Sequence, residues 1–313
     1  MRARLVLLFV FIALFLGCGG KEGEGAKAAE KEQSMEDALA LLPGNAIAVG
    51  TVDARAFFGS KTFGSELAKA IEKYVPIGKE ANFDAARDVD RVTWASYSFQ
   101  GVDAAAIVIG RFDEAKIKEV ARSNTPTKMG APLVVSQYAG RDVYTVSNVG
   151  FTVLSKDRVI VGSEAGIRRV LERIKDKRVK RDILPWMIST VETPGASAAA
   201  AVDLASNPAP QEALKMIPSA ALQKAKAIRV LTSFKETGIE AAASGTFPDE
   251  ASAQAAKGDV DNAASWAKWA AVFGIQIKNM NIAVEKSDVQ VKLEVDDQSL
   301  KALLSLLPQI LGR

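Results

Sequence analysis

The sequence predicts an α+β protein: two repeated units of antiparallel sheet covered by helices on one face, after a cleaved signal and a flexible tether. Three observations lead to this fold class. Strand-like runs occur in pairs joined by tight turns, stretches with helical periodicity separate the pairs, and the second half of the chain repeats the order of the first. Strand pairs with short turns form antiparallel sheets, because parallel strands need long crossover connections.

The chain begins with the features of an export signal. Arg2 and Arg4 precede an apolar run over residues 5–16, which ends at Gly17 and Cys18. These twelve apolar residues are too few to span a bilayer, which needs about 20. They suit the hydrophobic region of a secretory signal, so residues 1–17 are predicted to be a signal peptide.

The end of this run, Leu14-Phe15-Leu16-Gly17-Cys18, resembles the lipobox of bacterial lipoproteins, in which a small residue precedes an invariant cysteine. The resemblance implies cleavage before Cys18, acylation of Cys18 and anchoring to a bacterial membrane. Gly19 stands where an aspartate would imply retention at the inner membrane, so the outer membrane, with the chain facing the periplasm, is expected. The alternatives are a plain signal peptide with a chance cysteine and an uncleaved anchor.

A polar segment follows the cysteine. Residues 19–34 contain no large apolar side chain, so they have nothing to bury in a core. Together with Cys18 they are predicted to form an acylated, flexible tether over residues 18–34. The folded part is then expected to comprise a first domain (35–175), a basic linker (176–193) and a second domain (194–313).

In the first domain, a short helix is predicted over residues 35–42 because Pro43 ends the helical pattern. Apolar alternation predicts the next strand, over 45–55, and Asp113 is placed to cap a later helix. The remaining predicted elements are a helix over 63–74, strands over 91–99 and 104–112, a helix over 113–123, four strands between 133 and 163, and a helix ending at residue 174.

The second domain is predicted to follow the same order. Its elements are a strand over 196–206, a helix over 210–224, paired strands over 227–236 and 238–247, a helix over 249–273, a hairpin over 275–296, and a helix over 298–311. Val52-Asp53 matches Val202-Asp203 at an offset of 150 residues, and Gly110-Arg111-Phe112 matches Gly245-Thr246-Phe247 at an offset of 135. We interpret these matches as a duplication; the alternative is chance similarity between short, compositionally biased segments.

This layout, opened by the sequence LPGNAIAVGTVD over residues 42–53, resembles uncharacterised secreted bacterial lipoproteins built from a duplicated α+β unit. The resemblance extends over roughly residues 35–311. It implies no particular reaction and no catalytic residues.

Composition excludes several kinds of chemistry. The chain has no histidine, and its only cysteine is Cys18. Ser-His-Asp and Cys-His catalysis and His/Cys zinc sites are therefore impossible, and no cofactor or metal is expected. Removing residues 1–17 takes away Arg2 and Arg4, so the formal charge falls from +3 to +1. A nearly neutral, exported chain is a poor candidate for binding nucleic acid.

The remaining catalytic candidates favour structural roles. Ser265-Trp266-Ala267-Lys268 has the Ser-x-x-Lys spacing of penicillin-recognising enzymes, but the other motifs of those enzymes are missing. The acidic doublets at 113–114, 249–250 and 296–297 each lie where a strand pattern changes to a helical one, so they are predicted to cap helices. The chain is therefore expected not to be an enzyme.

Two features could form a binding surface. Trp266, Trp269 and Phe273 lie on one stripe of a predicted helix, either in the core or in a groove for a lipid or peptide. The second feature is a basic segment over residues 168–181, with eight cations against Glu172 and Asp176, a net charge of +6. Its cations are Arg168, Arg169, Arg173, Lys175, Lys177, Arg178, Lys180 and Arg181.

Val170, Leu171 and Ile174 are expected to face the core, while Arg169, Arg173 and Lys177 stay solvated. This basic segment is either a soluble helix end, whose cations suit the helix dipole, or a patch for an anionic partner: phospholipid or lipopolysaccharide headgroups, or an acidic protein.

Three functions follow from these features. The favoured one is a lipid-anchored cell-envelope protein that acts as a non-catalytic binding or structural module of unknown ligand. The first alternative is a carrier of an apolar ligand, such as a lipid, held between helix and sheet. The second is an envelope enzyme that uses carboxylates or a Ser-Lys pair.

Overall fold

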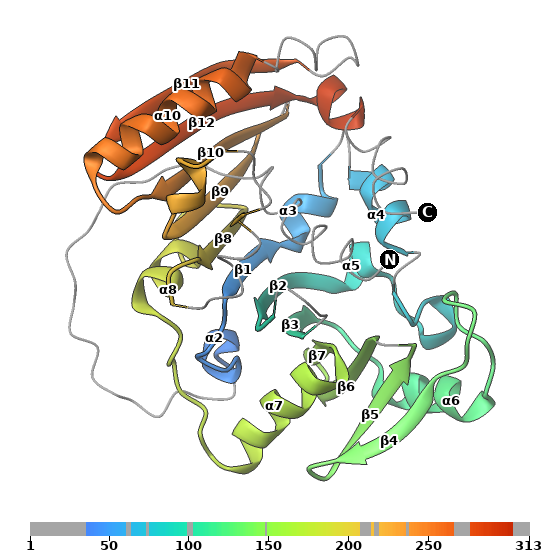
Figure 1. Cartoon of the computed structure of the whole chain (residues 1–313). Helices are drawn as coiled ribbons and strands as arrows, with labels where there is room; N and C mark the ends of the chain where they lie inside the picture. Colours follow the sequence, from blue (N-terminus) through green and yellow to red (C-terminus); the bar gives the residue numbers. More distant parts are fainter. Residues whose placement is uncertain are drawn as a thin grey trace.

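The computed structural model describes residues 36–60, 64–72, 75–98, 103–147, 149–206, 214–215, 219–235, 238–265 and 276–302. Their core is one twelve-stranded sheet in the order β11-β12-β10-β9-β8-β1-β2-β3-β7-β6-β5-β4 (Figure 1). All neighbouring strands are antiparallel. The predicted α+β class with antiparallel sheet is thus confirmed.

The strands have the following bounds. The first half contributes β1 (Ala48–Asp53), β2 (Val89–Ser96), β3 (Ala104–Gly110), β4 (Val134–Tyr138), β5 (Arg141–Val146), β6 (Val149–Ser155) and β7 (Arg158–Gly162). The second half contributes β8 (Ala198–Asp203), β9 (Ala227–Lys235), β10 (Gly238–Thr246), β11 (Ile277–Glu285) and β12 (Asp288–Asp296).

The two halves join edge to edge through β1 and β8, so they share one sheet and do not form two separate ones. Outward from this junction, the order is β1-β2-β3-β7-β6 on one side and β8-β9-β10-β12-β11 on the other. Strands β5 and β4 extend the first half only. In both halves a helix follows the third of these strands: α6 (Glu114–Ser123) after β3 and α10 (Glu250–Ser265) after β10.

The register of the junction relates the two halves locally by a two-fold axis. Gly50 lies opposite Ala200, which is 150 residues further along the chain. The backbone N–H of Asp53 donates to Ser197 O at 2.7 Å, and the N–H of Asp203 donates to Ile47 O at 2.8 Å. Both bonds obey the offset of 150 residues seen between Val52-Asp53 and Val202-Asp203. This arrangement agrees with the interpretation of a duplication.

Helices cover both faces of the first half, not one face as expected. On one face, α2 (Ala38–Leu41), α7 (Glu164–Lys175) and α8 (Pro185–Val191) pack against alternate apolar residues of the central strands. On the other, α6 and the turn η1 (Lys79–Ala81) pack against the residues in between. Because β3 and β7 carry apolar side chains on both sides, such as Ile107 beside Val108, each face needs a cover.

The remaining described helices are α3 (Ala54–Phe58), α4 (Gly64–Glu72), α5 (Ala85–Asp88) and η2 (Leu222–Lys224). In the second half, α10 packs against β11 and β12, at the end of the sheet opposite β4 (Figure 1). By strand register, the described residues of α10 lie on the same face as α6. None of the helices in the described part of the chain is long and apolar enough to cross a membrane.

The segment 176–193, expected to be a basic linker, also belongs to the core. It contains α8, and its residues Ile183, Met187 and Val191 are buried against β1 and β8. Cys18, the tether, the stripe of Trp266, Trp269 and Phe273, and the chain beyond residue 302 lie outside the described residues.

Candidate functional site: the arginine clamp and the basic segment

The first carboxylate of each acidic doublet caps a helix, as predicted. Asp113 accepts the N–H of Lys116 at 3.0 Å, and Asp249 accepts that of Ser252 at 2.7 Å. Asp296 accepts the N–H of Ser299 at 2.9 Å, at the start of the helical residues 297–302. These carboxylates satisfy N–H groups that a helix leaves without partners.

All five arginines of the basic segment form ion pairs. Arg168 pairs with Glu164, and Arg169 pairs with Asp103, both at 2.6 Å. Arg178 pairs with Asp176 at 2.9 Å. The guanidinium groups of Arg168 and Arg169 also lie over the rings of Tyr138 and Tyr97, respectively.

The expectation that Arg173 stays solvated is wrong. Its side chain is 6% exposed and donates to both carboxylate oxygens of Asp182, at 2.9 and 3.1 Å. The same guanidinium donates to Ala40 O at 3.1 Å and Lys180 O at 2.7 Å. Arg173 is buried because α2, 133 residues away in the sequence, packs over its position on α7.

Arg181 makes a second link to the start of the folded chain. It donates to Asp37 at 2.6 Å and to Glu192 at 2.6 Å. Burial alone would lower the pKa of Arg181, but the hydrogen bonds to Glu192 and Asp37 outweigh it and raise the pKa. Asp37 at the same time caps α2, accepting the N–H of Leu39 at 3.0 Å.

We call Arg173, Arg181 and their partners Asp37, Asp182 and Glu192 the arginine clamp. The clamp joins α2, the first described helix after the predicted tether, to α7 and to the residues flanking α8. Its hydrogen bonds are charge-assisted, and such bonds are stronger than hydrogen bonds between neutral groups.

Three cations of the segment remain for a partner. Lys175, Lys177 and Lys180 are exposed, and none has a carboxylate partner among the described residues. Lys175 ends α7, and Lys177 and Lys180 lie within five residues after it, close in sequence to the clamp. The eight-cation patch predicted from the sequence is thus reduced to three lysines.

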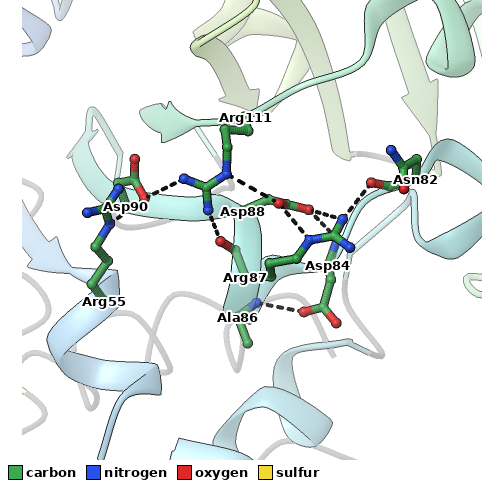
Figure 2. A network of polar contacts seen from close by, with 8 residues as sticks. All are labelled: Arg55, Asn82, Asp84, Ala86, Arg87, Asp88, Asp90 and Arg111. Carbon is green, nitrogen blue, oxygen red and sulfur yellow. Dashed lines mark hydrogen bonds and ion pairs between the residues drawn. The ribbon is translucent and has the colours of Figure 1, made fainter.

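A second charged network, missed by the sequence analysis, joins the ends of β2 and β3 (Figure 2). Arg87 donates to both carboxylate oxygens of the buried Asp88, at 2.8 and 2.6 Å. Arg111 approaches Asp88 and Asp90 at 3.5 Å each, and Arg55 pairs with Asp90 at 2.6 Å. The hydrogen bond from Arg87 holds the pKa of Asp88 below its ordinary value.

In the sequence these two carboxylates stand in the pattern Asp88-Val89-Asp90, which lacks the glycine and the twelfth-position glutamate of a calcium loop. The partners Arg55 and Arg111 are far away in the chain, so no local spacing indicates them. Each carboxylate of Asp88 and Asp90 is occupied by guanidinium groups, which suits a structural role. Within the described ranges, no group of His, Cys, Asp or Glu side chains is arranged to hold a metal ion.

The fold and the clamp define an α+β protein with one continuous antiparallel sheet whose clustered charges hold elements together. Neither a protein-family model nor a curated protein matches this chain. Among solved structures, crystal form I of TP0453 matches with a TM-score of 0.54 at 10% identity, covering 88% of this chain and 98% of that chain. Crystal form III of TP0453 matches with a TM-score of 0.52, also at 10% identity, covering 88% and 100%. At this identity the likeness concerns the fold alone.

Proposed function

We propose that this chain is a lipid-anchored protein of the bacterial cell envelope, and that its folded part binds a partner or supports a structure without catalysing a reaction. The observation that carries the proposal is the lipobox-like segment ending at Cys18, followed by the polar residues 19–34. The first carboxylate of each acidic doublet (Asp113, Asp249 and Asp296) caps a helix. The buried Asp88 accepts hydrogen bonds from Arg87. These carboxylates therefore have structural partners, which favours a non-catalytic role.

The arginine clamp supports the anchoring role. An anchored domain is held through the residue where its tether enters the fold, which here is close to Asp37. Asp37 is bound by Arg181, and the carbonyl of Ala40 is bound by Arg173. These links attach the entry point to the main sheet through α7 and the segment around α8.

The position of the three lysines that have no carboxylate partner among the described residues suggests the partner. A flexible tether of about 16 residues has an average span of roughly 20–24 Å, so the entry point stays near the membrane. Lys175, Lys177 and Lys180 lie at this end of the fold and are exposed. Each lysine close to an anionic membrane contributes about 1 kcal/mol of attraction. We propose that these three lysines contact anionic lipid headgroups and orient the anchored domain.

Replacing Cys18 by alanine tests the anchor. We expect Cys18→Ala to abolish processing and lipid labelling in cells and to move the protein out of the detergent phase on phase separation. Separating the inner and outer membranes then tests the expected outer-membrane location. Unchanged processing and unchanged lipid labelling in Cys18→Ala would refute the lipoprotein assignment.

The lysines are tested by the binding of the chain from residue 19 onward to vesicles with and without anionic lipid. We expect binding that requires anionic lipid, weakens as salt increases, and is lost when Lys175, Lys177 and Lys180 are changed to glutamine. A matched control changes Lys286, Lys292 and Lys301, three exposed lysines at the other end of the sheet. Equal losses in both triple variants would contradict the proposed orientation.

A second candidate, a carrier of an apolar ligand, is favoured by the small side chains on the face of the sheet that also carries α6. On this face, neighbouring positions of β1, β8, β9 and β10 carry small residues: Gly50, Ala198, Ala200, Thr232, Ala241 and Ala243. The hydroxyl of Thr232 is buried and has no hydrogen-bond partner among the described residues. Small side chains leave space above a sheet for a further group, and above Gly50 the ring of Trp94 occupies that space. Mass spectrometry of the protein purified without detergent would detect a co-purifying lipid; a lipid-free protein that also takes up no added lipid would rule out this candidate.

A further inference from the structure

Strand β4 forms one edge of the sheet and exposes apolar side chains. Among the described strands it pairs with β5 only, and none of them lies along its other side. Val134 is 61% exposed and Val135 is 46% exposed, and no other large apolar side chain in the described part of the chain is comparably exposed. An open edge with apolar side chains is a template for pairing with another strand.

The opposite edge of the sheet, β11, carries features that discourage such pairing. A bulge interrupts its register between Lys278 and Asn281, and Asn279 has a left-handed backbone with φ of 49°. Lysines and bulges are the usual protection of an edge strand. Strand β4 has neither a bulge nor a charged residue, since its sequence is Val-Val-Ser-Gln-Tyr.

The turn between β4 and β5 determines which backbone groups face the open edge. Ala139 and Gly140 have φ of 50° and 77°, as in the two-residue turns typical of hairpins. In such a hairpin the flanking residues, Tyr138 and Arg141, are a hydrogen-bonded pair, and hydrogen-bonded pairs then alternate along the ladder. The N–H and C=O groups of Val135 and Gln137 therefore point outward.

We propose that β4 pairs antiparallel with β4 of a second copy of this chain, centred on Ser136. In this register Val135 of each copy faces Gln137 of the other, and the outward groups of both residues form four hydrogen bonds. A two-fold axis at Ser136 makes the contact self-complementary, as a closed dimer requires. No charged side chain of β4 meets its own copy.

The side chains also match in this register. Val134 of each copy faces Tyr138 of the other on the face that carries α7, and aromatic residues pair well with β-branched ones across strands. Tyr138 is held in place because its hydroxyl bonds Glu172 and the Arg168 guanidinium lies 4.8 Å from its ring centroid. The dimer would cover both exposed valines and join two sheets into one. With five residues per copy, we expect a weak dimer.

Disulfide trapping tests the register in the full chain carrying Cys18→Ser, which has no other cysteine. In the proposed dimer, residues 136 of the two copies are directly opposite each other in a non-hydrogen-bonded pair, close enough for a disulfide. We expect Ser136→Cys to form disulfide dimers at least ten times faster than Gln137→Cys, which has the same edge position but faces Val135 of the partner.

A second variant removes only the outward donor. Val135→Pro deletes an N–H that makes no bond to β5, so the monomer should keep its circular dichroism spectrum while the trapping of Ser136→Cys falls to the rate of Gln137→Cys. Val135→Thr keeps this N–H donor, so the rate of disulfide trapping of Ser136→Cys should stay within two-fold of its rate without the Val135 change. Equal trapping of Ser136→Cys and Gln137→Cys would overturn the proposal. So would trapping of Ser136→Cys in cells to another envelope protein but not to itself.

Discussion

Arg173 and Asp182 form a two-pronged ion pair in which the guanidinium is almost fully buried and the carboxylate lies at its edge. Gly44 packs directly on Asp182, since a Cβ at Gly44 would lie 2.7 Å from the carboxylate carbon of Asp182 and even closer to its backbone carbonyl oxygen. Arg173 thus connects α7, α2 and the segment before α8. Its removal should therefore weaken the packing of all three.

We therefore expect Arg173→Met to lower the free energy of unfolding by about 2–4 kcal/mol, because it leaves two carbonyls and a carboxylate without their shared donor. Arg178→Met is the matched control, since Arg178 makes an exposed pair with Asp176 and should change stability by at most about 0.5 kcal/mol. Urea titrations at pH 7 measure both. Similar values for the two variants would contradict the structural role of Arg173.

The substitutions Gly50→Ala and Gly258→Ala should change the free energy of unfolding in opposite directions. A Cβ at Gly50 would lie 2.5 Å from the ring of Trp94, so Gly50→Ala should displace Trp94, change its fluorescence and cost about 1–3 kcal/mol. Gly258, in α10, has open space around it, so Gly258→Ala should add up to about 1 kcal/mol through helix propensity. A stabilising Gly50→Ala would show that this close approach is unimportant.

The two-fold relation at the junction of β1 and β8 predicts equivalent roles for Asp53, which caps α3, and Asp203, which accepts backbone N–H groups of the bend at residues 204–206. Asp53 accepts the N–H of Ala56 at 3.0 Å, and Asp203 accepts that of Ser206, 150 residues later, at 3.3 Å. We expect Asp53→Ala and Asp203→Ala each to cost about 1 kcal/mol. Because the two residues lie at opposite ends of the strand pair, the double variant should show the sum within about 0.5 kcal/mol. Strong non-additivity in thermal or urea unfolding would argue against two independent, equivalent carboxylate acceptors.

The lowered pKa of Asp296 leads us to expect that the fold loses stability in acid. Its hydrogen bond from Ser299 and its ion pair with Lys278 lower its pKa to about 2. A carboxylate with a lowered pKa stabilises the fold above its ordinary pKa, and this contribution is lost as the pH falls from about 4 to about 2. The difference in stability between the wild type and Asp296→Asn should thus be constant from pH 7 to about 4 and then shrink. Asp261→Asn, in the exposed pair with Lys257, serves as the control; a difference for Asp296→Asn that does not depend on pH would contradict the assignment.

Local features of the fold could be predicted well. The caps at Asp113 and Asp249 and the strand pairs with tight turns depend on residues a few positions apart, which the sequence displays directly. The burial of Arg173 could not be predicted, because α2 covers it from 133 residues away. The same holds for the contact between Asp88 and Arg111, because Arg111 lies close to Asp88 only when β2 and β3 pair.

The sequence by itself determined the lipobox-like N-terminus, the exclusion of histidine and cysteine chemistry, and the alternation of strands and helices. These properties depend on residue identity or on short-range periodicity. Only the tertiary structure decided that the halves share one sheet, that all five arginines of the basic segment are paired, and that β4 is an open edge. Each of these depends on which backbone edges and side chains meet across long stretches of chain, and side-chain periodicity carries no information about such partners.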